Sequence, residues 1–382
     1  MNFLVVSRRC DAFYADPGGV NLSTHTIKNV TRHIQLSANF MDHYSGKPTA
    51  YLDQNILDVL RKHNPIDFKD ELLEKYQIVY SDETLKEIKR SGQNHEEFLK
   101  ILQELKAYHL KVRMNEDFTP RGDATITDRN PFDAYTEYCE NLALVYENMQ
   151  EATASSLLKF YGGNVGHSFD DISDLQSESF EELLKYISEQ TKEFEEMFPD
   201  LAEGIKQSLE NMQQSFDHAL SQSALEMKKH VENDRNWSGV KEYRDATGIG
   251  PVQLNNIKPP KVIEKIWELY KKSEPYKGFS IEQFLGISKH PIYNFREMHF
   301  FEKVTSAYNV LNVVGYYPDS KMRDKQRFTA AMSDAGHASM ASFCDIVLSA
   351  DSAFINKTRA VYEFLNSRTQ VISVKVNIVN AV

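Results

Sequence analysis

Acidic side chains recur at the ends of short apolar runs, and their spacing makes them the residues best placed for chemistry. Asp53 and Asp351 each follow an apolar run directly. Glu87 lies in a helical pattern after another run, and Asp334 lies in an alanine-rich helical pattern. In open parallel sheets, ligands bind beyond the carboxyl ends of the strands. The four carboxylates are therefore expected to converge at that edge.

Four carboxylates brought together repel one another unless they hold a cation. Hard oxygen ligands with few His or Cys residues suit Mg²⁺ or Mn²⁺. Such sites typically perform phosphoryl chemistry, in which the metal activates water and stabilises the leaving oxygen. The alternative is chance, because 55 acidic residues will place some near strand ends in any fold.

The elements that must position these residues alternate between strands and helices. Apolar runs near 50–52, 77–80 and 108–114 are separated by helical patterns, which predicts a parallel sheet covered by helices. The polar stretch 116–131 is predicted to be a loop. Residues 132–287 show only helical spacing, and strand patterns return at 346–349 and 370–379. The predicted fold class is α/β, a three-layer core with a mostly parallel sheet interrupted by a large all-α insertion.

This pattern divides the 382 residues into three predicted parts. Residues 1–48 have little apolar periodicity and are expected to form an N-terminal extension. Residues 49–131 and 316–382 are expected to form one α/β domain that is split in the sequence. Residues 132–315 are expected to form the helical insertion domain.

Four motifs occur in an order that resembles the PIN-like nuclease domain family. They are a strand leading into Asp53-Gln54-Asn55, a Ser81-led helix carrying Glu87, an alanine-rich helix led by Asp334, and a strand ending in Ser349-Ala350-Asp351. The resemblance covers about 48–115 and 322–382. The chain departs from the family in its long insertion, where the family has a short helical link, and in having Ser349 where the family usually has Thr.

The resemblance implies a metal-dependent endonuclease that usually acts on RNA. Its acidic positions fall on Asp53, Glu87, Asp334 and Asp351, which would be the catalytic residues. Asp53, Asp334 and Asp351 would hold Mg²⁺ or Mn²⁺, and Glu87 would be a further ligand or would orient the water. Glu83, one helical turn before Glu87, is an alternative ligand.

Several neighbouring residues are candidates for supporting roles. Asn55 could orient Asp53 or cap a helix, and Ser81 is a good helix cap. Asp345 is expected to cap a helix–strand junction and to support the site, and Ser349 keeps the hydroxyl of the family's Thr. His337 lies one turn after Asp334 and could touch substrate, or it could be a packed or surface histidine.

Basic residues just before Asp334 are candidates for nucleic-acid binding. Arg323, Lys325 and Arg327 could contact the phosphate backbone, although a solvated helix end explains them equally well. The net charge of −11 lies entirely within 167–235, so the remaining chain is balanced. The acidic total therefore does not exclude a nucleic-acid partner.

The cysteines and the hydropathy of the sequence indicate in which cellular compartment the chain is expected. Three cysteines far apart indicate a reducing compartment, so a cytoplasmic location is expected. The longest run free of charged residues has 15 residues, at 304–318, whereas a membrane-spanning helix needs about 20. No membrane partner is expected.

The leading hypothesis is an endoribonuclease, with RNA a better candidate substrate than DNA. One alternative is a DNA or structure-specific nuclease. Another is a catalytically silent PIN-like scaffold whose helical insertion binds a protein partner or a second copy of the chain. Metal binding would separate the scaffold from both nucleases.

A chain that starts at Met41 is expected to fold as well as the full chain. Residues 1–40 lack apolar periodicity, and the first predicted core strand begins after them. Soluble expression and the melting temperature of the two chains, compared side by side, test this expectation. Loss of soluble protein would show that the extension packs on the core.

Overall fold

The computed structural model describes residues 46–116, 119–141, 144–195, 199–289 and 296–375. Almost all of the predicted N-terminal extension lies outside the described residues. The same holds for 376–379, the end of the predicted closing strand. Within the described part, none of the helices is long and apolar enough to cross a membrane.

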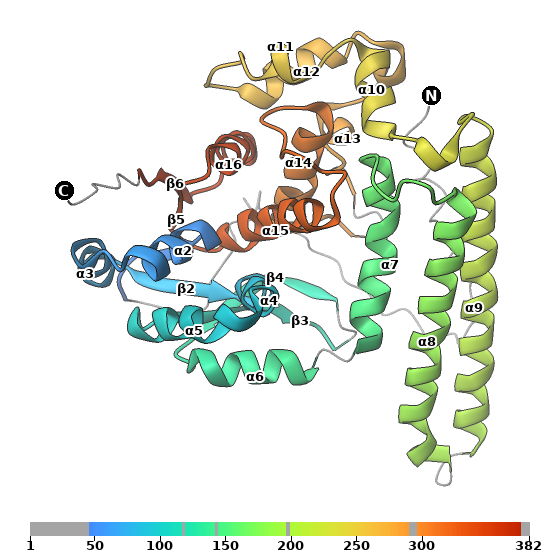
Figure 1. The fold of residues 1–382 in the computed structure, drawn as a ribbon, viewed down its shortest axis with the longest axis horizontal. Coiled ribbons are helices and arrows are strands. Elements are labelled where there is room, and N and C mark those ends of the chain that lie inside the picture. Colours follow the sequence, from blue (N-terminus) through green and yellow to red (C-terminus); the bar gives the residue numbers. More distant parts are fainter. Residues whose placement is uncertain (1–45, 117–118, 142–143, 196–198, 290–295, 376–382) are drawn as a thin grey trace, which may run out of the picture.

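A six-stranded sheet with the strand order β4-β3-β2-β1-β5-β6 forms the centre of the fold (Figure 1). Neighbouring strands are parallel except β3 and β4, which are antiparallel. Strands from both ends of the chain therefore share one sheet, as the sequence predicts. The strands are β1 Thr49–Leu52, β2 Gln77–Ser81, β3 Tyr108–Met114, β4 Pro120–Thr127, β5 Ile346–Ser349 and β6 Gln370–Ser373.

Side chains of the central strands alternate between two hydrophobic cores, one on each face of the sheet. Ala50 and Leu52 of β1 face one core, whereas Tyr51 between them faces the other. Strands buried on both faces have continuous apolar sequences, as β1 and β5 do. The result is a mixed α/β fold in which helices cover both faces.

The helices of the first face follow the first three strands closely in sequence. They supply the apolar residues that pack on Ala50, Leu52, Ile78 and Tyr80. They are α2 Gln54–His63, α3 Ile66–Lys75, α4 Asp82–Arg90, α5 His95–Glu104 and α6 Pro131–Asn141.

The helices of the second face come from the later part of the chain. Their buried residues form one core with Tyr51, Val79 and Val347 of the sheet. They are α10 Gly239–Thr247, α11 Pro251–Leu254, α12 Val262–Tyr270, α13 Ile281–Phe284, α14 Phe300–Val314, α15 Lys325–Ala341 and α16 Ser352–Leu365.

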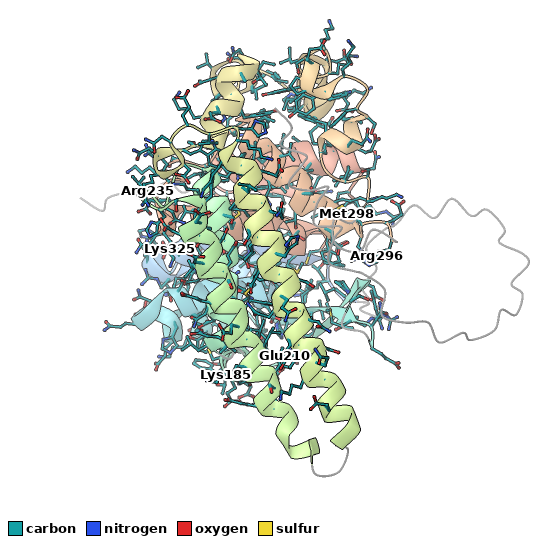
Figure 2. All side chains as sticks on the ribbon, turned by 90° about the vertical axis from the view of Figure 1, so that its right-hand side faces the viewer. Lys185, Glu210, Arg235, Arg296, Met298 and Lys325 are labelled. Carbon is teal, nitrogen blue, oxygen red and sulfur yellow. The ribbon has the colours of Figure 1, made fainter. Side chains whose placement is uncertain are left out.

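The remaining long helices stand beside the sheet. They are α7 Leu144–Phe160, α8 Phe169–Glu195 and α9 Pro199–Lys228. Figures 1 and 2 show α8 and α9 as a projecting pair, with Lys185 and Glu210 towards the end farthest from α10. This pair carries most of the acidic segment 167–235. The predicted insertion thus contains helices of different kinds. Helix α6 and the helices α10–α14 belong to the two cores of the sheet, whereas α7–α9 contribute to smaller clusters, one of which includes residues of α10 and α15.

The predicted loop at 116–131 is wrong, because residues 120–127 form the edge strand β4. The inward positions of β4 are Gly122, Ala124 and Ile126, and two of these residues are too small to give an apolar signal. Gly122 has φ +87°, and a Cβ there would lie 2.3 Å from Nδ1 of His299. His299 in turn makes a 2.8 Å hydrogen bond from Nε2 to the Pro120 carbonyl. Close packing thus selects glycine at a position that the sequence suggests is a turn.

Asp345 fastens β5 to β1 at the amino ends of these strands. Its carboxylate accepts hydrogen bonds from the Thr49 backbone N–H at 2.8 Å and from the Thr49 hydroxyl at 2.9 Å. Thr49 is only 1% exposed, so water does not replace these bonds. The expected supporting role of Asp345 at the carboxylate site is therefore wrong, because Asp345 lies at the opposite edge of the sheet.

Asp345→Ala is expected to destabilise the fold by about 1–3 kcal/mol, because it leaves buried polar groups of Thr49 unsatisfied. Urea unfolding of wild type and variant measures the change. Asp174→Ala, at an exposed position on α8, is the control and should change stability by less than about 0.5 kcal/mol. Equal effects of the two substitutions would contradict the role given to Asp345.

Candidate active site

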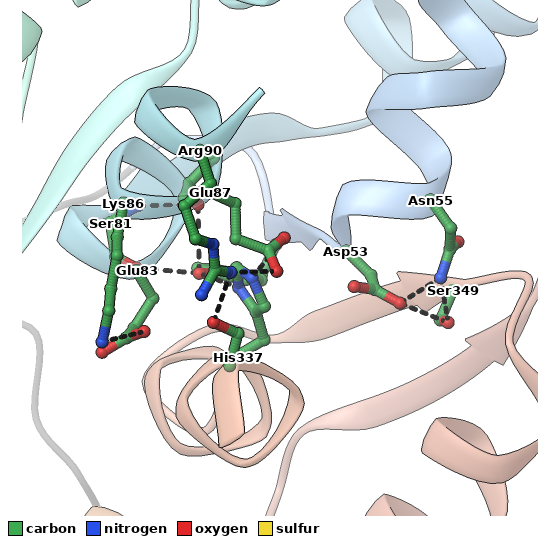
Figure 3. A network of polar contacts seen from close by, with 12 residues as sticks. Asp53, Asn55, Ser81, Glu83, Lys86, Glu87, Arg90, His337 and Ser349 are labelled. Carbon is green, nitrogen blue, oxygen red and sulfur yellow. Dashed lines mark hydrogen bonds and ion pairs between the residues drawn. The ribbon is translucent and has the colours of Figure 1, made fainter. Parts of the chain in front are cut away.

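Asp53 is buried immediately after β1, and neighbouring side chains hold its carboxylate. Oδ2 accepts hydrogen bonds from the Ser349 hydroxyl at 2.7 Å and from the Asn55 side-chain amide (Figure 3). Asn55 also accepts from the Ala350 backbone N–H at 2.8 Å. Asp53 precedes α2 but makes no capping bond. The Asp53 carboxylate is thus held where β1 and β5 end, by hydrogen bonds from Ser349 and Asn55.

Glu87 of α4 is paired with two basic side chains. Oε1 accepts from Arg90 at 2.8 Å, and Oε2 lies 3.1 Å from Nε2 of His337. The second contact is at ion-pair distance but is poorly aligned as a hydrogen bond. Burial opposes ionisation of Glu87, yet His337 and Arg90 outweigh it and lower its pKa. Glu87 is therefore an ionised carboxylate near Asp53. Burial raises the pKa of Asp53, and the charge of Glu87 adds to that effect.

His337 is fully buried between α15, α4 and β1. Its Nδ1 lies 2.8 Å from the Tyr51 hydroxyl, which also contacts the Ser81 hydroxyl at 2.8 Å. Burial alone would lower the pKa of His337, but Tyr51, Glu87 and Asp53 raise it well above its usual range. His337 is therefore a packed histidine that carries positive charge, and Ser81 contributes through Tyr51.

Asp334 of α15 lies among other carboxylates. Burial raises its pKa well above the usual range, and Asp53 and Asp319 raise it further. Tyr308 of α14 is fully buried beside them, and its hydroxyl has no hydrogen-bond partner among the described residues. Burial raises the pKa of Tyr308, and the carboxylates that add to this effect are those of Asp334, Asp319, Asp53 and Asp351. These four aspartates therefore lie near enough to Tyr308 for their charges to oppose its ionisation.

Lys357 supplies a second buried positive charge in this region. Its Nζ donates to Oδ2 of Asp319 at 2.6 Å and to Oδ1 of Asn312 at 2.8 Å. The same nitrogen lies 4.6 Å from the centre of the Tyr308 ring. Burial lowers the pKa of Lys357, whereas Asp319 and then Asp334 oppose that effect. Lys357 thus offsets part of the charge that gathers around Tyr308.

Asp351 is an exposed helix cap in addition to being a neighbour of Tyr308. Its Oδ1 accepts from the backbone N–H groups of Ala353 at 2.6 Å and Phe354 at 2.9 Å, at the start of α16. These bonds satisfy donors that have no partner within the helix. One carboxylate oxygen of this predicted metal ligand is thus occupied by α16.

The three predicted nucleic-acid-binding residues have separate surroundings. Arg323 donates from Nε to the Gly162 carbonyl at 3.0 Å, and Lys325 pairs with Glu151 at 2.7 Å. Arg327 is exposed, and its backbone N–H donates to the capping residue Asp324. None of these contacts joins them to the carboxylates described above.

The carboxylates do not form a ready metal centre. Among the described residues, no three or more His, Cys, Asp or Glu side chains are grouped so that they could hold a metal ion. The partners given above explain why these carboxylates are not grouped. Glu87 forms ion pairs with Arg90 and His337, and Asp351 caps α16. The donor chemistry still fits Mg²⁺ or Mn²⁺, since the carboxylates of Asp53 and Asp334 are desolvated, and Asp53 together with Asp319 raises the pKa of Asp334. The buried Tyr308 hydroxyl, whose pKa these carboxylates also raise, has no hydrogen-bond partner among the described residues.

Sequence reasoning missed Asp319, Tyr308 and Lys357. Lys357 carries a signal that could have been found, because it occupies the apolar face of its helix, between Phe354 and Val361. A lysine on such a face requires a buried acidic partner. Asp319 carries no comparable signal, since an Asp in a turn is common.

Comparisons of the chain with protein-family models, with curated proteins and with solved structures found no match.

Asp334→Asn is expected to raise the melting temperature of the metal-free protein at neutral pH. A carboxyl whose folded-state pKa is raised stabilises the fold while protonated, so its contribution is present below about pH 4 and is lost as pH rises through the folded-state pKa. The gain from Asn should therefore grow as pH rises above about 4. Thermal melting in EDTA across this range measures it.

Asp174→Asn on α8 is the matched control, because it removes one charge from an exposed position. Its effect should change little over the same pH range. A gain for Asp334→Asn that is constant or that shrinks with rising pH would contradict the proposed repulsion.

Proposed function

We propose that the chain is a metal-dependent endonuclease that hydrolyses phosphodiester bonds, with RNA as the favoured substrate. The observation that carries the proposal is the place of the partly buried Asp334 near Asp53 and Asp319, where burial and their charges raise its pKa well above the usual range. Mutual repulsion of desolvated carboxylates costs free energy that a bound cation would offset. The order of motifs, which resembles that of PIN-like nucleases, supports the same function.

Asp53 and Asp334, with Asp351, would hold Mg²⁺ or Mn²⁺. A bound metal of this kind supplies Lewis acidity and lowers the pKa of water. The Ser349 and Asn55 side chains fix the carboxylate of Asp53, so its position is set before any ligand arrives. Such preorganisation is what electrostatic catalysis requires.

Glu87 is the residue suited to orient the attacking water. Its pKa is lowered by His337 and Arg90, so the carboxylate is ionised and can accept a hydrogen bond from that water. His337 and Tyr51 hold Glu87 from the buried side. We assign His337 this positioning role in place of direct contact with substrate, because its side chain is fully buried.

The catalytically silent scaffold remains the second candidate. The absence of a ready group of metal ligands among the described residues favours it. The projecting pair α8 and α9 offers a surface for a protein partner, with Leu175, Met212 and Leu225 about half exposed. A DNA nuclease differs from the main proposal only in substrate.

Asp53→Asn and Asp334→Asn are each expected to lower Mn²⁺-dependent cleavage of single-stranded RNA by about 10²–10³ or more. Each substitution removes a carboxylate charge that would hold the metal. Cleavage rates with RNA and with DNA of the same sequence measure the effect and the substrate preference. Asp174→Asn is the control and should retain full activity.

Metal binding separates the nuclease from the scaffold. Mn²⁺ should raise the melting temperature of the wild type and of Asp174→Asn, because a ligand that binds only the folded state stabilises it. It should not raise that of Asp334→Asn. A wild type that shows neither this increase nor metal-dependent cleavage would leave the scaffold as the better description.

A further inference from the structure

A cavity of about 710 Å³ lies where α10, the loop before α11 and the segment 318–323 meet. Its size is within the range of cavities that bind small molecules. Asp319 is one of the lining residues, and its carboxylate also contacts Lys357. The cavity therefore adjoins the carboxylate region but is formed largely by different residues.

Positive charge predominates on the lining of this cavity. Four basic residues line it, against the two acids Asp245 and Asp319. Both acids have partners, since Asp245 pairs with Lys241 and Asp319 pairs with Lys357 at 2.6 Å. Arg244, Lys321 and Arg323 are left without a carboxylate partner among the described side chains.

The contacts of these three cations leave donors available. Arg244 uses Nε and Nη2 to donate to the backbone carbonyls of Val313 and Asn312, at the end of α14. Arg323 uses only Nε, which donates to the Gly162 carbonyl at 3.0 Å. Lys321 is exposed, and its side chain makes no hydrogen bond or ion pair within the described part of the chain, although its backbone carbonyl accepts from the Asp324 N–H. Unpaired arginine donors beside a cavity are typical of phosphate recognition.

One part of the lining is apolar, and Ser238 and Asn312 add polar groups to the rest. Tyr161, Val240 and Met322 line the cavity together with Ile249 and Pro251. Tyr161 is 8% exposed and contributes an aromatic ring to this wall. A cavity of this volume is larger than a lone phosphate ion needs, and its apolar wall suits the ring of a nucleobase.

We propose that this cavity binds a phosphate group attached to a nucleoside, held by Arg244, Lys321 and Arg323. The phosphate belongs either to a free nucleotide or to a nucleic-acid strand, and the chemistry of recognition is the same. The proposal does not depend on nuclease activity. It concerns binding alone, and its test can be performed without a metal ion.

Isothermal titration calorimetry in EDTA tests the proposal with three probes. They are adenosine 5′-monophosphate, adenosine, and a short single-stranded RNA. At least one phosphate-bearing probe should bind, and adenosine should bind about tenfold more weakly than the monophosphate if the free nucleotide is the ligand. Arg323→Gln and Lys321→Gln should each weaken binding about tenfold.

Lys185→Gln is the matched control, because it removes one exposed cation from α8, away from the cavity. It should leave binding unchanged. If Arg323→Gln melts early because it loses its bond to Gly162, the exposed Lys321→Gln decides the test. Binding of the monophosphate identifies a free nucleotide as the source, and binding of RNA alone identifies a strand.

Two results would overturn the proposal. One is that neither the monophosphate nor the RNA binds at millimolar concentration. The other is that binding is as strong in Arg323→Gln and Lys321→Gln as in Lys185→Gln.

Discussion

The burial of negative charge at the carboxyl edge of the sheet depends on two positive charges buried with it. His337 contacts Glu87 and Tyr51, and Lys357 contacts Asp319. Isolated carboxylates in such positions would pay a large desolvation penalty or would become neutral. The two cations allow carboxylates from β1, α4 and the segment before α15 to occupy one region. The helices α14, α15 and α16, which carry several of these groups, are held over the sheet by the apolar core that they share with it.

The contacts of the acidic side chains within the protein also explain why the positions that the family resemblance predicts lie near one another without forming a metal site. The predicted acidic positions Asp53, Asp334 and Asp351 all influence Tyr308, so they occupy one neighbourhood. The carboxylates of Asp53 and Asp351 nevertheless have hydrogen-bond partners within the protein, and no described group of acids is arranged as a metal site. A cation would have to compete with Asn55 for Asp53 and with α16 for Asp351. Binding of a metal ion would thus compete with hydrogen bonds that already stabilise the fold.

The sequence predicts the parts of this fold that local pattern determines. Strands β1, β2, β3, β5 and β6 and the small-residue helix α15 are confirmed, because continuous apolar runs and helical spacing are local signals. Strand β4 was missed because Gly122 and Ala124 occupy inward positions. Lys357 and Asp319 were missed as a pair because 38 residues separate them. Asp53 and Asp334 were predicted as site residues because Asp53 follows an apolar run and Asp334 lies within an alanine-rich helical pattern.

The pairing of β1 with β5 also determines when the site can exist during protein synthesis. Asp53 and its partner Ser349 are 296 residues apart, so the ribosome makes one long before the other. The first three parallel strands and their helices emerge early, whereas β5, α15 and α16 emerge last. Domains generally fold from the N-terminal side during synthesis. A nascent or prematurely terminated chain therefore lacks the assembled carboxylate cluster, and any activity that requires it begins only when translation is nearly complete.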